Sequence, residues 1–251
     1  MRRIPWLAIV VAGLLLPLSA AAAKRPIVLE DLSRLREVSD PQRSPEGAWV
    51  AYTVRSIDVE KDKRDTDIWM ARWDGSEEIR VTSSPENESD PRFSPDGKYL
   101  AFLSSRGDEE EKKKGAQVWL LHRAGGEAVK LTDIQGGVSD LAWSPDSSRL
   151  ALVVDDYDAA EEPEKMEGWK RKTAPPIVLD RYHFKEDIDG YLKGLYAHIG
   201  VFDLASKSLT MVTSGAADDS DPAWSPDGRT IAFRSKRGHA EPDRTENEDL
   251  F

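Results

Sequence analysis

The 251-residue chain has an ordinary globular composition, with 39% hydrophobic and 32% charged residues. Its formal net charge of −11 makes nucleic acid and anionic membrane surfaces poor partners, because both are negatively charged themselves. It contains no cysteine, which excludes disulfides, thiolate metal sites, a cysteine nucleophile and a lipidated cysteine.

The first 23 residues have the pattern of a secretory signal peptide. Arg2 and Arg3 give a positive start, residues 6–16 are apolar, and Ala21–Ala23 offers a small-residue cleavage site. The apolar stretch is short for a membrane-spanning helix, which favours a signal peptide. The alternative is an uncleaved membrane anchor. We predict cleavage after Ala23 and an exported protein, periplasmic or secreted, whose mature chain is not bound to a membrane.

Residues 24–38 are predicted to form a lead-in helix. Leu29, Leu32 and Leu35 recur three residues apart, which places them on one face of a helix. We expect the helical part, from Val28 to Glu37, to pack on the rim of the domain that follows.

The remainder of the chain, residues 39–251, is organised by a repeat. Each copy begins with Ser-Asp and contains a Ser-Pro pair, and the pairs start at Ser44, Ser94, Ser144 and Ser225. Their separations are 50, 50 and 81 residues (94 − 44, 144 − 94 and 225 − 144). A fixed period of this length, with one insertion, is typical of β-propellers with four-stranded blades. The sequence therefore predicts an all-β fold.

Each unit is interpreted as four strands arranged around one tight turn. Residues 94–97, Ser-Pro-Asp-Gly, fit a type I turn, because proline presets φ at the second position and glycine suits the fourth. An apolar strand follows, then a hairpin, then one strand that leads to the next turn. Ser94 resembles a possible nucleophile, but a serine in a repeated turn is better explained by turn chemistry.

An aromatic residue precedes three of the four Ser-Pro pairs. These residues are Phe93, Trp143 and Trp224, whereas Arg43 breaks the pattern in the first copy. We expect each ring to end the first strand of its unit and to pack on the neighbouring unit.

The third unit carries an insertion around residues 155–196, which contains Trp169, Tyr182, His183, Phe184 and Tyr191. Because loops on a rigid scaffold often carry recognition, it is a candidate contact surface. The alternative is a β-extension that packs on its own blade. Elsewhere, the charged run 109–114 is interpreted as a solvated loop.

The fourth unit stops at the start of its hairpin, at residues 249–251. The repeat therefore predicts an incomplete propeller of about three and a half blades. We expect the chain to be the front part of a longer protein, because propellers close with about four to eight blades.

The sequence resembles the amino-terminal propeller of secreted prolyl oligopeptidase family serine peptidases, in the dipeptidyl-peptidase and acylaminoacyl-peptidase branches. The resemblance starts at Leu-Glu-Asp-Leu-Ser-Arg-Leu-Arg-Glu-Val-Ser-Asp-Pro, residues 29–41, and continues through the first Ser-Pro unit and Thr-Asp-Ile-Trp, residues 66–69. Residues 180–203 are also similar to that branch. The resemblance implies a propeller that restricts and orients peptide substrates for a carboxy-terminal α/β-hydrolase domain. TolB-type periplasmic propellers share the Ser-Pro-Asp-Gly unit, and binding of partner proteins without catalysis is the alternative function.

The sequence does not contain the catalytic residues that the resemblance implies. No Gly-x-Ser-x-Gly elbow occurs, and the nearest string, residues 137–141, lacks the second glycine. The four histidines have no plausible nucleophile partner: His122, His183, His198 and His239. We assign no catalytic residue, do not transfer the family's amine-binding glutamates to Glu161 or Glu162, and predict that the chain alone is inactive.

We also predict no cofactor and no metal site. Residues 187–190, Asp-Ile-Asp-Gly, resemble part of a calcium loop, but Lys185 stands where the first acid of the loop belongs. No phosphate-binding loop and no His-Glu-x-x-His zinc motif occur in the sequence.

Overall fold

The computed structural model describes residues 25–157, 176–179, 182–187, 190–192, 194–239 and 241–251. The predicted signal peptide, residues 1–23, and much of the insertion predicted around residues 155–196 lie outside the described residues. Of the helices in the described ranges, none is both long and apolar enough to cross a membrane.

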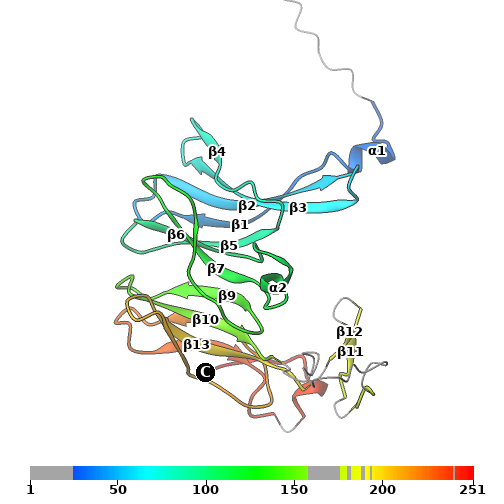
Figure 1. The fold of residues 1–251 in the computed structure, drawn as a ribbon, viewed down its shortest axis with the longest axis vertical. Helices are drawn as coiled ribbons and strands as arrows, with labels where there is room; N and C mark the ends of the chain where they lie inside the picture. Colours follow the sequence, from blue (N-terminus) through cyan, green and yellow to red (C-terminus); the bar gives the residue numbers. More distant parts are fainter. Residues whose placement is uncertain (1–24, 158–175, 180–181, 188–189, 193, 240) are drawn as a thin grey trace, which may run out of the picture.

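The described residues form a stack of antiparallel sheets, which follow one another in chain order (Figure 1). Blades 1 and 2 have four strands each, in the spatial order of the sequence. The strands of blade 1 are β1 (Glu37–Arg43), β2 (Trp49–Asp58), β3 (Lys63–Arg72) and β4 (Glu78–Arg80). The strands of blade 2 are β5 (Glu88–Phe93), β6 (Tyr99–Ser104), β7 (Gln117–His122) and β8 (Val129–Lys130).

Blade 3 has four strands and blade 4 has three within the described ranges. The strands of blade 3 are β9 (Val138–Trp143), β10 (Arg149–Asp155), β13 (Ala197–Asp203) and β14 (Ser208–Met211). The strands of blade 4 are β15 (Asp219–Trp224), β16 (Ile231–Ser235) and β17 (Asp249–Leu250). The predicted all-β propeller of about three and a half blades is therefore confirmed.

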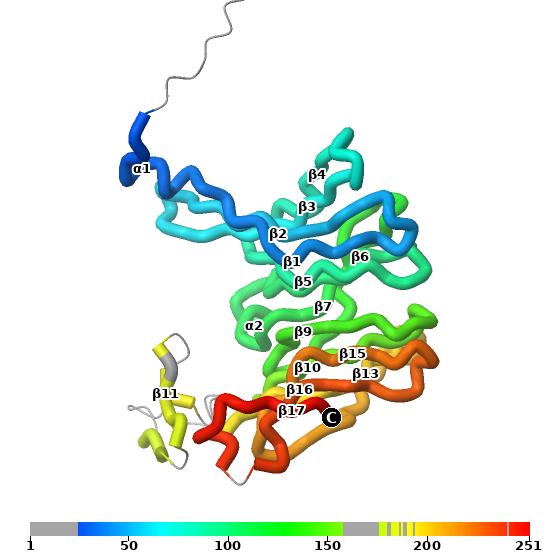
Figure 2. The backbone as a smooth tube through the Cα atoms, turned by 180° about the vertical axis from the view of Figure 1, so that it is seen from behind, coloured from blue at the N-terminus to red at the C-terminus, as the bar shows by residue number. Residues whose placement is uncertain are grey.

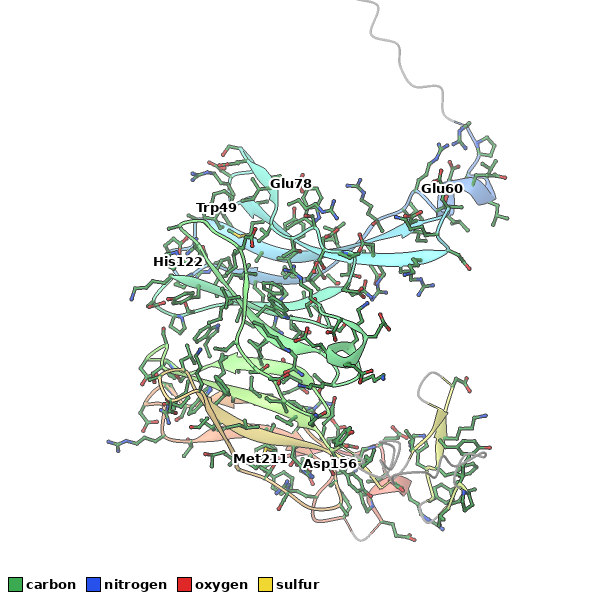
Figure 3. The ribbon with its side chains drawn as sticks, in the orientation of Figure 1. Trp49, Glu60, Glu78, His122, Asp156 and Met211 are labelled. Carbon is green, nitrogen blue, oxygen red and sulfur yellow. The ribbon has the colours of Figure 1, made fainter. Side chains whose placement is uncertain are left out.

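Within the described residues, three short helices and one hairpin lie outside the four blades. They are α1 (Leu29–Leu32), α2 (Glu109–Lys112), the 3-10 helix η2 (Pro242–Arg244) and the hairpin of β11 (Lys185–Glu186) and β12 (Gly190–Tyr191). Figures 1 and 2 place α1, α2 and the β11–β12 hairpin on one side of the stack, which we call the extension face. In Figure 3, Glu60 at the β2–β3 tip lies on this side, whereas Trp49 and His122 lie at the opposite ends of their strands.

The Ser-Pro turn forms as the sequence predicts, and its serine hydroxyl is occupied by the turn. Ser94 is fully buried, and its Oγ donates to Asp96 Oδ1 (2.7 Å) and accepts from the Tyr99 N–H (2.9 Å). Gly97 adopts φ +72°, which favours glycine. Equivalent Oγ-to-carboxylate hydrogen bonds are made by Ser144 and Ser225, at 2.6 Å each.

The aromatic residues at the ends of the first strands link neighbouring blades, as expected. The Trp143 Nε1–H donates to the main-chain oxygen of Arg92 (3.1 Å), and the Trp224 Nε1–H donates to that of Ala142 (3.1 Å). Two buried clusters fill the spaces between sheets. One lies between blades 1 and 2 and includes Ile68, Leu100 and Phe102. The other lies between blades 2 and 3 and includes Leu103, Val118, Leu141, Leu150 and Phe202.

The lead-in helix differs from the prediction. Only Leu29–Leu32 is helical, because Glu37 and Val38 already pair with β2 in strand β1. Leu29, Leu32 and Leu35 are 78%, 50% and 63% exposed, so they do not pack on the rim. A single turn of helix is marginal in water. The predicted packing is therefore wrong, and the leucines remain as an exposed apolar group.

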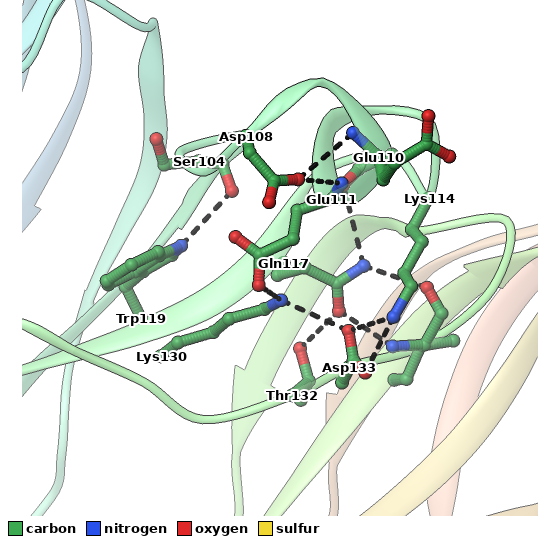
Figure 4. A network of polar contacts seen from close by, with 12 residues as sticks. Ser104, Asp108, Glu110, Glu111, Lys114, Gln117, Trp119, Lys130, Thr132 and Asp133 are labelled. Atoms are coloured by element: carbon green, nitrogen blue, oxygen red, sulfur yellow. Dashed lines mark hydrogen bonds and ion pairs between the residues drawn. The ribbon is translucent and has the colours of Figure 1, made fainter.

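The charged run 109–114 is also more ordered than the loop that was predicted. Asp108 caps α2, because its Oδ1 accepts from the N–H groups of Glu110 (3.0 Å) and Glu111 (2.9 Å). Figure 4 shows how lysines then tie the helix to blade 2. Lys114 bonds Asp133 (2.7 Å), and Lys130 bonds both Asp133 (3.1 Å) and Glu111 (3.2 Å). The acids and bases of this run therefore form ion pairs with one another and with blade 2, instead of lying free in solvent.

Candidate functional site

The first strands of the four blades lie side by side (Figure 2). Residues of these strands and of the Ser-Pro turns line a cleft, which we call the inner cleft. Its volume is about 420 Å³. Every blade contributes to it; the lining residues are Gln42, Arg43, Pro45, Arg92, Phe93, Pro95, Asp140, Leu141, Ala142, Trp143, Asp221 and Pro222. The Ser-Pro turns supply two of the prolines, so the cleft extends toward the face opposite the extensions.

The Ser-Asp-Pro sequence places an aspartate at the inner cleft by forming a β-bulge. Asp40, Asp90 and Asp221 have φ of +47°, +52° and +51°, and the register of each first strand shifts at this point. Aspartate tolerates the left-handed region, and the proline that follows needs no donor partner in the ladder. In β9, Leu141 replaces the proline, and its N–H donates to the Asp140 carboxylate (2.7 Å).

One arginine lies among these aspartates. Arg92 Nη1 is 2.5 Å from Asp40 Oδ2, and its Nη2 is 3.5 Å from Asp90 Oδ1 and 3.8 Å from Asp140 Oδ1. The three carboxylates belong to three successive blades. Asp221 instead pairs with Arg234 of β16 (2.7 Å). The inner cleft is therefore lined by Asp140, Asp221 and Arg92. The Arg92 guanidinium also pairs there with Asp40 and Asp90.

The electrostatics of the inner cleft favour keeping that guanidinium in place. Burial raises the pKa of the Asp90 and Asp140 carboxyls, and the positive charge of Arg92 opposes the rise. Like-charge repulsion adds to the rise, because Asp40 raises the pKa of Asp90, and Asp90 and Asp221 raise the pKa of Asp140. A cation at this position compensates charge that burial makes costly.

A second polar cluster joins the blades near the extension face. Asp219 of β15 is fully buried and receives the Arg237 Nε–H (3.1 Å) and a second, shorter bond from Arg237 Nη2. His198 Nδ1 of β13 lies 3.4 Å from Asp219 Oδ2. Burial acts to raise the pKa of Asp219, but the hydrogen bonds from Arg237 and its neighbours leave that pKa lowered. Blade 2 repeats the design, because Arg106 Nη2 lies 2.9 Å from the buried Glu88.

A further cleft of about 630 Å³ lies along the β2–β3 hairpin, and Asp65, Asp67, Trp69 and Arg80 are among its lining residues. Arg80 Nη2 donates to Asp67 Oδ2 (2.6 Å). Burial raises the pKa of Asp67. This cleft lies on the face of blade 1 that carries Val54 and Asp67, opposite the cluster that packs on blade 2.

The residues considered in the sequence are dispersed through the structure. His122 makes an edge contact with Tyr99 (ring centroids 5.2 Å apart), and His239 Nε2 lies 3.4 Å from Asp249. The main-chain N–H of His183 donates to Asp243 (3.4 Å). Of the calcium-like residues 187–190, residues 188–189 lie outside the described residues, as do Trp169, Glu161 and Glu162. Over the described ranges, no group of three or more histidine, aspartate or glutamate side chains is arranged to hold a metal ion.

The inner cleft was missed at the level of sequence. The signal was present, because Ser-Asp recurs in each copy with the next two positions occupied by Pro-Gln, Pro-Arg, Leu-Ala and Pro-Ala. In the sequence analysis, this Ser-Asp pattern was used only to locate the repeats, and no role was predicted for its aspartates. The ion pairs of Arg106 and Arg237 were also missed, although the sequence carried a signal for them. Each arginine follows the serine that ends a strand, Ser104 or Ser235, by two residues.

Comparisons with known proteins support the peptidase resemblance. No protein-family model matches the chain. In sequence it is 32% identical over 210 residues to the "Uncharacterized peptidase YuxL" of Bacillus subtilis (strain 168), a match that covers 84% of this chain and 31% of that protein. The chain thus spans about a third of the length of this curated relative.

Solved structures share the fold. An acylaminoacyl peptidase from Pyrococcus horikoshii matches with a TM-score of 0.62 and 20% identity, over 88% of this chain and 31% of that one. The β-propeller domain of the Trilobed protease from Pyrococcus furiosus matches with a TM-score of 0.53 and 19% identity, over 87% and 54%. The chain is thus a β-propeller with the fold of these peptidase propellers and, in sequence, a homologue of part of a curated peptidase.

Proposed function

We propose that this chain is the substrate-gating propeller portion of an exported serine peptidase that acts on peptides. The sequence similarity to a curated peptidase supports the peptidase assignment. The resemblance to the prolyl oligopeptidase family implies that a hydrolase domain carries the chemistry, and that the propeller controls which substrates reach it.

The observation that carries this proposal is that two groups of exposed apolar side chains lie on the extension face, one at the blade 1 end of the stack and one at the end formed by blades 3 and 4. The leucines of the α1 region are half to three-quarters exposed, and Tyr182, Phe184 and Tyr191 of the β11–β12 region are exposed as well. Figures 1 and 2 place both groups on one side of the blades. Apolar groups exposed together mark surfaces that other protein parts cover. A hydrolase domain seated on this face would meet both groups.

The inner cleft supports the gating role. It is lined by residues of the first strands and Ser-Pro turns, and charged and aromatic side chains are among them. A peptide in extended conformation fits such a passage, whereas a folded protein does not. The gate would then select by size and by conformation.

The test is made on the whole reading frame that contains this sequence, expressed and purified as it exists. A dipeptide chromogenic substrate reports the chemistry, and fluorescent casein reports access by large substrates. We expect turnover of the short substrate that is sensitive to serine-directed reagents, with slow turnover of casein. Residues 1–251 contain no cysteine, so an Ala142→Cys variant can be labelled in this region with a bulky polyethylene glycol maleimide once any cysteine elsewhere in the reading frame has been replaced by serine. Labelling at the inner cleft should slow peptide turnover.

The matched control is Ala205→Cys, an exposed position in the β13–β14 turn, labelled to the same extent. Equal turnover from both labelled proteins would contradict passage through the inner cleft. A reading frame that encodes no hydrolase domain would contradict the peptidase assignment and favour the alternative, a propeller that binds partner proteins without catalysis.

A further inference from the structure

Among the four copies of the repeat, only the second has a cationic side chain two residues after the aspartate of Ser-Asp, and this residue is Arg92. The equivalent positions in the other first strands hold Gln42, Ala142 and Ala223. Among the described contacts, the Gln42 amide bonds Asp40 of its own strand (Nε2 to Oδ1, 2.6 Å). Arg92 instead reaches Asp40 of blade 1, Asp90 of its own blade and Asp140 of blade 3. One side chain therefore connects three blades at their inner edge.

The main chain of Arg92 strengthens the connection. Its carbonyl oxygen accepts the Trp143 indole N–H (3.1 Å), so the residue is held to blade 3 at its backbone as well as at its guanidinium. The Arg92 and Asp140 side chains are 24% and 27% exposed, which means that both line the inner cleft and are shielded from much of the solvent. A guanidinium is suited to this task, because it is always charged and offers five donors in a fixed plane.

We propose that Arg92 is a clamp that holds the first three blades together at the inner cleft and so limits the width of the cleft. Its guanidinium neutralises carboxylates that would otherwise repel one another across blade boundaries, and its side chain occupies the space between them. The role as part of a gate rests on the proposed function, but the clamp itself is a property of this chain alone. Removing the guanidinium should widen the cleft and loosen the contacts between the first three blades.

The first test is chemical rescue on the chain without any other domain. Arg92→Ala should lower Tm, and N-ethylguanidinium chloride in the millimolar range should restore about 2–4 °C relative to sodium chloride at equal ionic strength. The same compound should leave the wild-type chain and Arg229→Ala unchanged. Arg229 is an exposed arginine in the blade 4 turn, so this control makes the same charge change away from the cleft. Equal effects of the compound on all three proteins would overturn the clamp.

The second test measures access. In an Ala142→Cys background, we compare the labelling rates of a small maleimide and a bulky one, with Ala205→Cys as the reference position. Arg92→Ala should raise the labelling rate of the bulky reagent about tenfold and that of the small reagent much less, because only the bulky reagent needs the cleft to widen. A tenfold change in rate corresponds to about 1.4 kcal/mol of opening free energy. If the alanine variant folds poorly, Arg92→Gln is used in its place in the same comparison, because β1 has glutamine at this position.

The outcomes separate the two proposals. Unchanged bulky-reagent rates in both Arg92 variants would refute the clamp and leave the peptidase assignment intact. Absence of a hydrolase domain in the reading frame would refute the proposed function, whereas rescue by ethylguanidinium and faster bulky labelling would still establish the clamp.

Discussion

His198 of β13 and Asp219 of β15 face one another across the boundary between blades 3 and 4, with Nδ1 and Oδ2 3.4 Å apart. Asp219 has no exposed surface, and its charge is balanced by Arg237, which follows the end of β16 by two residues. The contact joins one complete sheet to the three-stranded one. The buried carboxylate therefore contributes to the stability of blade 4, together with the Trp224 contact to Ala142.

We therefore expect Asp219→Asn to destabilise the chain by about 3 kcal/mol at neutral pH, because it leaves Arg237 without its buried partner. The pKa of Asp219 is lowered by folding, so its stabilisation is present above the unfolded-state value of 3.8 and is lost as pH falls through the folded-state pKa. Urea unfolding of the two proteins at pH 7 and near pH 3 measures this difference. The gap between them should narrow at the lower pH.

The matched control is Asp221→Asn, two residues along the same strand, where the carboxylate is 57% exposed and pairs with Arg234. An exposed pair of this kind contributes about 1 kcal/mol or less. If Asp221→Asn costs as much as Asp219→Asn, burial does not explain the effect.

Ser94→Ala should destabilise the chain by about 1–3 kcal/mol, because the buried Tyr99 N–H loses the Oγ that accepts its hydrogen bond. Thermal unfolding measures the change, and Ser76→Ala, in an exposed turn, is the control. Serine-directed reagents should not label Ser94, since its hydroxyl is buried and bonded to Asp96. Stoichiometric labelling of Ser94 would contradict its role as a turn residue.

Export should remove the first 23 residues. Mass spectrometry of the protein recovered from the periplasm or the medium should show Lys24 as the first residue. Recovery of a chain that begins at Met1 in a membrane fraction would favour the uncleaved anchor.

The 251-residue chain alone should not hydrolyse dipeptidyl or acylaminoacyl chromogenic substrates above a heat-inactivated control. Peptide hydrolysis by a serine peptidase needs a nucleophile, a histidine base, an orienting acid and an oxyanion hole. The described contacts of His122, His198 and His239 are with Tyr99, with aspartates and with a main-chain N–H. Turnover by the purified chain that a serine-directed reagent abolishes would overturn this expectation.

The repeat alone was enough to predict the blades, because the turn chemistry of Ser-Pro-Asp-Gly and the alternation of strands and hairpins are local properties. The tryptophan contacts between blades followed from the same repeat. The packing of the α1 region could not be predicted, since the spacing of Leu29, Leu32 and Leu35 fits a helix but does not say what covers it. The inner cleft depends on side chains from β1, β5 and β9 that meet only after the sheets have stacked.

The α2 region shows a different limit. A run of acids followed by bases is consistent with a solvated loop, and only the neighbouring strands reveal its partners. Lys130 and Asp133, which anchor the run, lie about 20 residues further along the chain. The helix also depends on Asp108, whose capping role needs the extended backbone conformation that the structure gives it.

The bulge at Ser-Asp sets the path of each first strand, and a different residue, two positions after the aspartate, provides the side chain at the inner edge of the blade. The Ser-Asp bulge recurs in all four first strands, with proline after the aspartate in three of them and Leu141 in β9. The next residue lines the inner cleft in the first three blades, as Gln42, Arg92 and Ala142. The four copies already hold Gln42, Arg92, Ala142 and Ala223 at this position on one common backbone. In the first three blades, the side chain at this position therefore sets the local width and charge of the inner cleft, so selectivity can change by single substitutions on a shared strand geometry.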